Sequence, residues 1–189
     1  MTDRSLPPDR DLIEGIRSGD PTTLGRLQAA YWDLLVQFAA RILDGNADPQ
    51  DVVQEAFIRL WTHRERWGTD GSVRALLYTV TRNAALDERR RQARSDRAAL
   101  RADMPTPEPV PSERAAAGEL RRAAAEAVSL LPPKRQEVFR LAREEGLTYA
   151  EISAIMGVSP QTVANQMSLA LSDLRHALKL HLVEEEPSP

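Results

Sequence analysis

A basic stretch at residues 82–91 carries side chains suited to holding single-stranded nucleic acid. It contains Asn83, Asp87, Arg90 and Arg91. Residues three or four apart on a helix share a face, so a helix here would present the amide, the carboxylate and the arginines together. Arginine cations can follow a phosphate backbone, which makes nucleic-acid contact one interpretation of this stretch. The other is a solvated helix end whose arginines complement the helix dipole.

Aromatic residues near this stretch extend the same pattern. Trp61, Trp67 and Tyr78 precede it, and aromatic faces can stack on unpaired bases. Between His63 and Arg101 there are ten arginines and five acidic residues, so the surrounding segment is basic although the whole chain has a net charge of −3. The alternative for the aromatic residues is the hydrophobic core, which fits Trp61 best.

A second functional pattern lies at residues 147–178 and reads as two capped helices. Thr148 and Glu151 have the spacing of a capping box, and Gly157 suits the left-handed position that ends a helix. Ser159 can then cap a second helix that has Pro160 in its first turn. This order is typical of a helix-turn-helix, whose second helix enters a DNA major groove. A helical hairpin within a bundle is the alternative.

A third surface is predicted on the helix at residues 48–61. Its apolar residues fall on one side, and the opposite side carries Asp51, Gln54, Glu55, Ile58 and Arg59. Solvation explains the charged residues, whereas an outward isoleucine hints at a protein partner. A single exposed isoleucine is nevertheless common on protein surfaces.

These three surfaces need helices to position them, and apolar spacings of three and four predict helices along most of the chain. Long alternating β-branched runs are absent, so the predicted fold class is all-α. Four prolines at alternate positions between residues 105 and 111 predict an extended spacer. We therefore predict two small helical domains at residues 9–100 and 119–182, with a Pro-rich linker at 101–118.

Composition argues against several other classes. There is no cysteine, so thiolate metal sites and disulfides are excluded, and we expect neither a metal nor a cofactor. No segment reaches the roughly 20 apolar residues of a membrane span, and the N-terminus does not resemble a signal peptide, which predicts a cytoplasmic protein without membrane insertion. The three histidines are scattered and no phosphate-binding loop is present, so we do not expect an enzyme.

The order of the motifs resembles an RNA polymerase sigma factor. DPQDVVQEAFIRLW followed by RALLYTVTRNAALDERR is similar to region 2, and LPPKRQEVFRL followed by EGLTYAEISAIMGVSPQTV is similar to region 4. With only these two regions and a short linker, the chain resembles the extracytoplasmic-function group. The resemblance covers about residues 9–95 and 119–180.

The resemblance implies a function in promoter recognition and a set of roles. The partners would be core RNA polymerase, promoter DNA and an anti-sigma factor. Core polymerase would contact Asp51, Gln54, Glu55, Ile58 and Arg59. The melted minus-10 element would contact Trp67, Ser72, Tyr78, Arg82, Asn83, Asp87, Arg90 and Arg91. The minus-35 duplex would contact Ser159, Pro160, Gln161, Thr162, Asn165, Gln166 and Arg175.

The recognition helix departs from the family pattern in its charge. Residues 159–174 contain no lysine or arginine and one acid, Asp173. Losing about three phosphate contacts would reduce the steepness with which DNA affinity falls with salt by about 2.7 log units of affinity per log unit of salt concentration. We therefore expect this domain to bind duplex weakly on its own, with Asn and Gln still able to read adenine edges. A stand-alone helix-turn-helix regulator is the alternative function, but it would have no need of a strand-binding domain.

Overall fold

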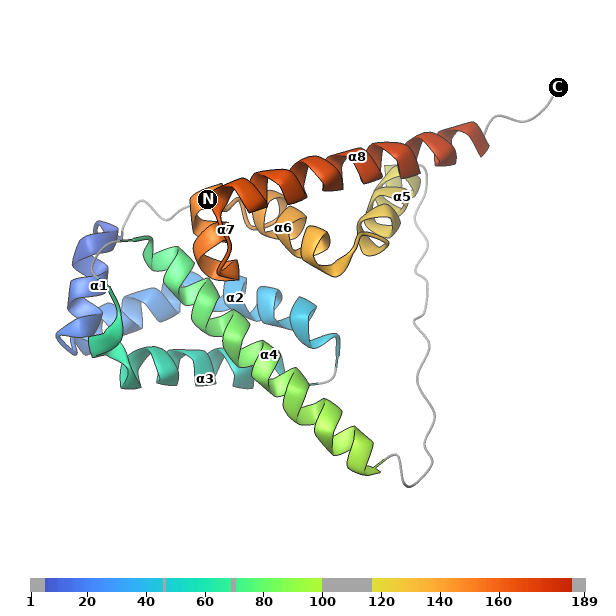
Figure 1. Ribbon diagram of the computed structural model, residues 1–189. Coiled ribbons are helices and arrows are strands. Elements are labelled where there is room, and N and C mark those ends of the chain that lie inside the picture. Colours follow the sequence, from blue (N-terminus) through green and yellow to red (C-terminus); the bar gives the residue numbers. More distant parts are fainter. Residues whose placement is uncertain (1–5, 46, 69–70, 100–116, 185–189) are drawn as a thin grey trace. The chain divides into compact units, whose positions relative to one another are not determined.

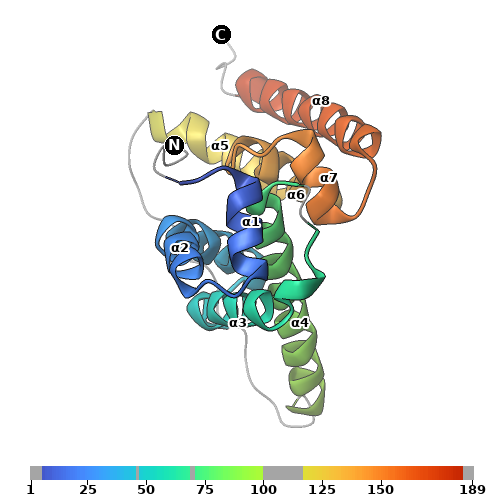
Figure 2. The same ribbon diagram turned by 90° about the vertical axis from the view of Figure 1, so that its left-hand side faces the viewer.

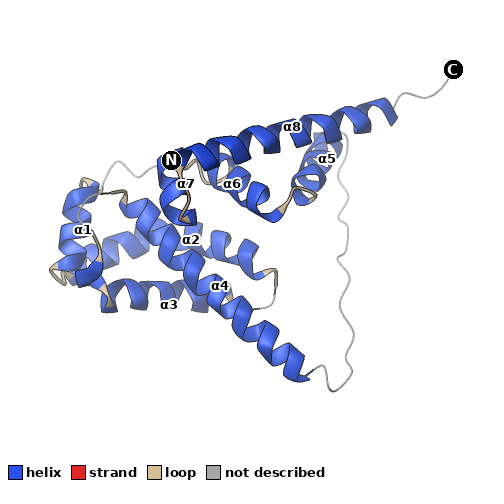
Figure 3. Cartoon of the chain, viewed as in Figure 1, coloured by secondary structure: helices blue, strands red, loops and turns tan. Residues whose placement is uncertain are grey.

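The computed structural model describes residues 6–45, 47–68, 71–99 and 117–184. Apart from loops and turns, all of the described structure is helical (Figure 3), which confirms the all-α prediction. The backbone divides into two compact units, Met1–Pro105 and Thr106–Pro189, called here the N-terminal and C-terminal units. The predicted linker at residues 101–118 lies outside the described residues except for its last two positions.

Aspartate-proline pairs start two helices of the N-terminal unit. The Asp20 carboxylate accepts hydrogen bonds from the backbone N–H groups of Thr22 (2.9 Å) and Thr23 (3.1 Å), and Asp48 accepts one from Gln50 (2.8 Å). These caps satisfy amides that a helix start leaves without partners. The unit's elements are α1 (Asp9–Arg17), α2 (Pro21–Leu43), α3 (Pro49–Thr62), the short 3-10 helix η1 (Arg64–Arg66) and α4 (Val73–Ala99).

Three helices, α2, α3 and α4, pack on one another and form the core of the N-terminal unit (Figure 1). Leu27, Leu35, Val53, Leu60 and Tyr78 are almost fully buried between them. The C-terminal end of α4 extends beyond α2 and α3 in both views (Figures 1 and 2). The apolar first half of α4 therefore belongs to the core, and its second half carries polar side chains past the bundle.

The C-terminal unit contains the helix-turn-helix. Its elements are α5 (Ala117–Ser129), α6 (Pro133–Arg143), α7 (Tyr149–Met156) and α8 (Pro160–Glu184). The backbone N–H of Thr148 donates to Glu151 Oε2 (2.8 Å), and the N–H of Glu151 donates to Thr148 Oγ1 (3.2 Å), which completes the predicted capping box. Gly157 has a φ of 65° and ends α7 as predicted. The second helix runs further than the apolar pattern indicated, to Glu184.

The long helix α8 lies against α5, α6 and α7 within the C-terminal unit (Figure 1). Leu141, Ile152, Val163 and Met167 are buried where α6, α7 and α8 meet. This packing uses one side of α8 and leaves Gln161, Thr162 and Asn165 exposed on the other. The turn and the core thus present the first turns of α8 to solvent.

Candidate polymerase and nucleic-acid interface

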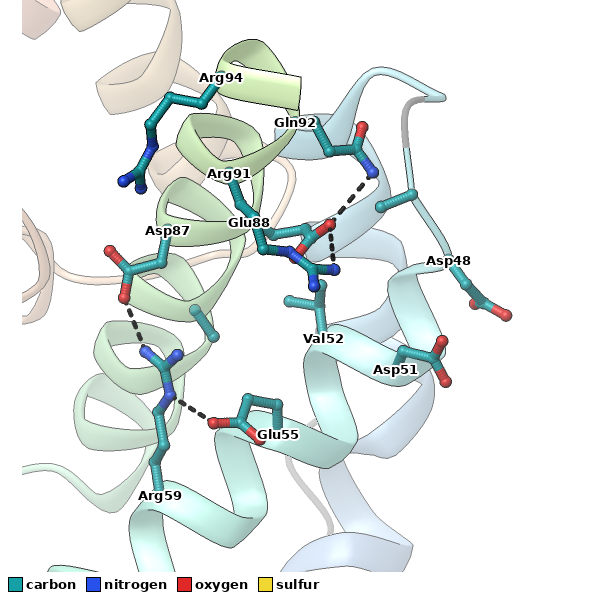
Figure 4. A pocket seen from close by; sticks show the side chains of 12 residues that line it. Asp48, Asp51, Val52, Glu55, Arg59, Asp87, Glu88, Arg91, Gln92 and Arg94 are labelled. Atoms are coloured by element: carbon teal, nitrogen blue, oxygen red, sulfur yellow. Dashed lines mark hydrogen bonds and ion pairs between the residues drawn. The ribbon is translucent and has the colours of Figure 1, made fainter. Parts of the chain in front are cut away.

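A groove between α3 and α4 brings two of the predicted surfaces together. Its volume is about 890 Å³, and most of its lining is charged (Figure 4). Asp51, Glu55 and Arg59 come from the surface predicted to bind polymerase, whereas Asp87 and Arg91 come from the one predicted to bind DNA. The two predicted surfaces of the N-terminal unit are therefore contiguous.

Arg59 joins α3 to α4 through two carboxylates. Its Nε donates to Glu55 Oε1 on its own helix at 2.8 Å, and its Nη1 donates to Asp87 Oδ2 on α4 at 2.8 Å (Figure 4). The other oxygen of Asp87 accepts from Arg90 Nη1 at 3.1 Å. Both Asp87 oxygens therefore have guanidinium partners.

Arg91 belongs to a separate cluster on α4. Its Nε and Nη2 donate to the two oxygens of Glu88 at 2.8 and 2.9 Å, and Gln92 Nε2 also donates to Glu88 at 3.1 Å. The Glu88 side chain is 15% exposed, against 77% for Arg91. Arg91 is thus held by Glu88 while most of its surface remains open to solvent.

Acid titration is expected to expose the contribution of Asp87 to stability. The hydrogen bond from Arg59 holds the pKa of the Asp87 carboxyl below its ordinary value of 3.8. A carboxyl with a lowered folded-state pKa stabilises the fold above its unfolded-state pKa, and this contribution is lost as the pH falls through the folded-state value. Asp87→Asn should therefore be less stable than wild type at pH 7, by less than about 1 kcal/mol because the pair is exposed.

Urea unfolding of both proteins across pH provides the measurement. The stability difference should persist down to about pH 4 and shrink below it, as the wild-type carboxyl becomes protonated. A difference that stays constant to pH 3 would mean that the Asn substitution acts through packing, and not through the ion pairs.

The aromatic residues predicted to contact the strand differ in how accessible their side chains are. Tyr78 is 0% exposed and its ring lies 4.9 Å from that of Phe38, centroid to centroid. The prediction that Tyr78 contacts DNA is therefore wrong for this fold, since a buried ring offers no face to a base. Trp67 is half-buried and its Nε1 donates to the backbone oxygen of Leu60 (3.0 Å). Ser72 accepts from the backbone N–H of Ala75 (3.2 Å) and thereby caps α4.

Several of the other predicted residues of the N-terminal unit have accessible side chains. Ile58 is 52% exposed, a large fraction for an isoleucine, and Asp51 and Gln54 are exposed beside it on α3. Asn83 is exposed and Arg82 half-buried on α4. The outer face of α3 and the polar part of α4 thus remain available to partners.

The first turns of α8 carry two side-chain pairs. Ser159 Oγ accepts from the backbone N–H of Thr162 (3.1 Å) and lies 2.9 Å from its hydroxyl, so Ser159 acts as the helix cap. Gln161 Nε2 donates to Asn165 Oδ1 at 3.0 Å. Pro160 occupies the first turn beside them, Gln166 is half-buried, and Arg175 is exposed further along the helix.

An ion pair between α6 and α8 changes the electrostatics of the recognition helix. Arg135 Nη1 donates to Asp173 Oδ2 at 2.6 Å. The one acid in residues 159–174 is therefore neutralised within the unit. The same pair engages Arg135 of α6 in a contact within the unit.

Some of the residues that line the α3–α4 groove were not predicted from the sequence. Asp48, Glu88, Gln92 and Arg94 all contribute to it. The spacing of Glu88 with Arg91 and Gln92 was a readable signal, because residues three and four apart on a helix interact. No local signal could have placed Asp48 there, since its position depends on how α3 packs on α4.

Family models match both parts of the chain. The model described as Sigma-70 region 2 matches residues 27–95, and the model described as Sigma-70, region 4 matches residues 121–174. The first range includes α3 and the polar part of α4, and the second includes α7 and the start of α8. The two regions occur in the order that the motifs indicated.

Curated relatives place the chain within a subgroup. The ECF RNA polymerase sigma factor SigK of Mycobacterium ulcerans is 32% identical over 143 residues, which cover 74% of this chain and 76% of the relative. A longer relative, the probable RNA polymerase sigma factor RfaY of Xanthomonas campestris, is 30% identical over 166 residues, and the chain covers 42% of its length. The chain belongs to the extracytoplasmic-function (ECF) family of RNA polymerase sigma factors.

Solved structures share the fold. CnrH, solved in complex with the cytosolic domain of CnrY, is 27% identical, with a TM-score of 0.64 over 91% of this chain and 97% of CnrH. The sigma factor RpoE of Bartonella quintana, solved with the anti-sigma factor NepR, is 19% identical, with a TM-score of 0.62 over 82% of this chain and 96% of that chain. The second likeness concerns the fold alone.

Within the described residues, no helix combines the length and apolarity that crossing a membrane requires.

Proposed function

We propose that this chain binds core RNA polymerase and directs it to promoters, with residues 9–100 acting as region 2, 101–118 as the linker and 119–182 as region 4. The observation that carries the proposal is that the family models of region 2 and region 4 both match this chain, in that order. The two matched units expose polar faces on α3, α4 and α8. The chemistry of RNA synthesis belongs to the polymerase in this scheme, and the chain itself has no catalytic role.

The outer face of α3 is the proposed contact with polymerase. Asp51, Gln54 and Glu55 supply acidic and amide groups around the exposed side chain of Ile58. An apolar side chain surrounded by polar groups suits a protein interface, because its burial adds affinity while the charges fix orientation. In the family this face docks on the clamp coiled coil of the β′ subunit, and we propose the same partner here.

The polar part of α4 is the proposed contact with the opened minus-10 strand. Asn83 can hydrogen-bond a displaced base, and Arg90 can bind the backbone. Holding bases outside the duplex stabilises the open strand, so binding energy replaces nucleotide hydrolysis as the source of melting. The burial of Tyr78 removes its ring from stacking with bases, so any stacking on this side of the unit falls to the half-buried Trp67.

The start of α8 is the proposed contact with the minus-35 duplex. Gln161 and Asn165 are exposed amides, and amides of this kind pair with adenine in the major groove. Since residues 159–174 contain no lysine or arginine, this helix supplies base contacts with few phosphate contacts. We expect its duplex affinity to depend on the polymerase that holds it in place.

An anti-sigma factor is the proposed regulatory partner, and the cytoplasm is the proposed location. A protein of this fold is known in complex with an anti-sigma factor, which supports the first proposal. A role in transcription requires the compartment that holds chromosomal DNA, which supports the second.

Run-off transcription tests the proposed function. Core polymerase, the purified chain and a library of genomic fragments should yield transcripts with defined start sites that are absent without the chain. Omitting the chain and adding a heat-denatured sample are the controls. If the chain binds fragments but never changes the start sites used by polymerase, it is a regulator of another kind.

A further inference from the structure

Asp87 places a negative charge among the residues that are proposed to hold the DNA strand. It follows Asn83 by four residues and precedes Arg90 by three, so all three share one face of α4. The Asp87 side chain is 50% exposed. A free carboxylate there would repel the phosphates of an approaching strand. Strand binding on this face therefore needs a counter-charge that stays with Asp87.

Two guanidinium groups can neutralise Asp87, and they differ in solvent exposure and in how firmly they are held. Arg90 is 68% exposed and reaches Asp87 from the adjacent turn of the same helix. Arg59 is 34% exposed and reaches Asp87 from α3. Its second hydrogen bond, to Glu55, holds its guanidinium between the two helices (Figure 4). Arg59 is the more firmly positioned partner, and Arg90 is the more accessible to DNA.

We propose that Arg59 is a positioning residue of the strand-binding face, and that it neutralises Asp87 so that Arg90 can leave this carboxylate and bind a DNA phosphate. The inference rests on the proposed function. It also moves Arg59 away from the set predicted to contact polymerase, because its guanidinium is turned toward α4. A planar guanidinium with several fixed donors suits a residue that serves two carboxylates.

Without Arg59, two favourable states of Arg90 exclude each other. If Arg90 stays on Asp87, it is lost to the DNA backbone. If Arg90 binds a phosphate, both of the guanidinium partners that the described residues give Asp87 are gone. Once the Asp87 charge is removed, Arg90 can bind a phosphate without leaving an unpaired carboxylate. The proposal therefore predicts that substitutions of Arg59 and Asp87 have non-additive effects on strand binding.

A double-mutant cycle provides the test. The full chain bound to core polymerase is titrated against a fluorescein-labelled, random-sequence, single-stranded oligonucleotide pool, with anisotropy as the readout. Arg59→Gln should weaken binding about threefold, the size that exposed charge pairs reach in such cycles. Asp87→Asn should then improve binding by about threefold more in the Arg59→Gln background than in wild type.

Matched controls separate this coupling from a general charge effect. Arg89→Gln removes the same charge from the opposite side of α4, since two residues along a helix correspond to about 200° of rotation. The benefit of Asp87→Asn should be the same in that background as in wild type. Arg59→Lys, which keeps the charge but lacks the guanidinium fork, should lose less affinity than Arg59→Gln. Thermal melting of each variant verifies folding.

Two results would overturn the inference. One is additivity of Arg59→Gln and Asp87→Asn in strand binding. The other is a loss of polymerase affinity in Arg59→Gln that accounts for the whole binding defect and that Asp87→Asn leaves unrepaired. If the wild-type chain failed to bind polymerase at all, the proposed function would fail instead. The same cycle on the chain alone would still test the coupling of Arg59 to Asp87.

Discussion

Replacing Tyr78 with alanine is expected to lower the free energy of unfolding of the N-terminal unit by about 3–5 kcal/mol, the range for large aromatic residues truncated in a core. The side chain is fully buried and packs against Phe38. Truncation removes this buried surface and leaves a cavity that its neighbours fill only in part. Tyr78→Phe, which keeps the ring, should lose less stability than Tyr78→Ala.

Tryptophan fluorescence during urea unfolding measures this effect in the right part of the chain. All three tryptophans, Trp32, Trp61 and Trp67, belong to the N-terminal unit, so the signal reports that unit alone. Strand binding by Tyr78→Phe should match wild type. A Tyr78→Ala protein that unfolds like wild type but no longer binds single-stranded DNA would restore Tyr78 to the DNA interface.

Reversing the charge of Asp51 should reduce the affinity for core polymerase by about 30-fold, equivalent to about 2 kcal/mol, the threshold for an interface hot spot. Asp51 is exposed on α3 and lines the α3–α4 groove. Asp51→Lys replaces an attractive charge with a repulsive one, so the loss should exceed that of Asp51→Asn. It should also diminish as salt is raised, because exposed charges are screened.

Equilibrium binding of labelled chain to core polymerase, at low and at physiological salt, measures this loss. Asp33→Lys is the matched control, since Asp33 is an exposed aspartate on α2 outside the α3–α4 groove. Similar losses for the two variants would indicate a general dependence on net charge. The α3 face would then not be the site of docking.

Helix starts and stops were predictable from the sequence because they depend on neighbours along the chain. Asp20 and Asp48 cap helices whose amides lie two or three residues away, and the Thr148–Glu151 pair spans one turn. Gly157 adopts its left-handed conformation for a local steric reason. Such signals give the order of elements and hence the helix-turn-helix.

Roles that depend on how helices pack were harder to predict. Tyr78 and Asn83 both belong to the polar and aromatic pattern near residue 82, but α4 turns the first into the core and the second to solvent. A helix places residues five positions apart about 140° from each other, and only the neighbouring helices decide which side is covered. The sequence pattern therefore groups Tyr78 with the DNA-binding residues, whereas the fold places its ring in the core.

Spacing, caps and turn residues were enough to predict the all-helical class, the two motif-bearing regions and their order. Two ion pairs depend instead on how the helices pack: Arg59 meets Asp87, 28 residues away, and Arg135 meets Asp173, 38 residues away. Such pairs form where two helix surfaces come within hydrogen-bonding distance. Helix packing determines which surfaces come this close, and the periodicity within a single helix does not contain that information.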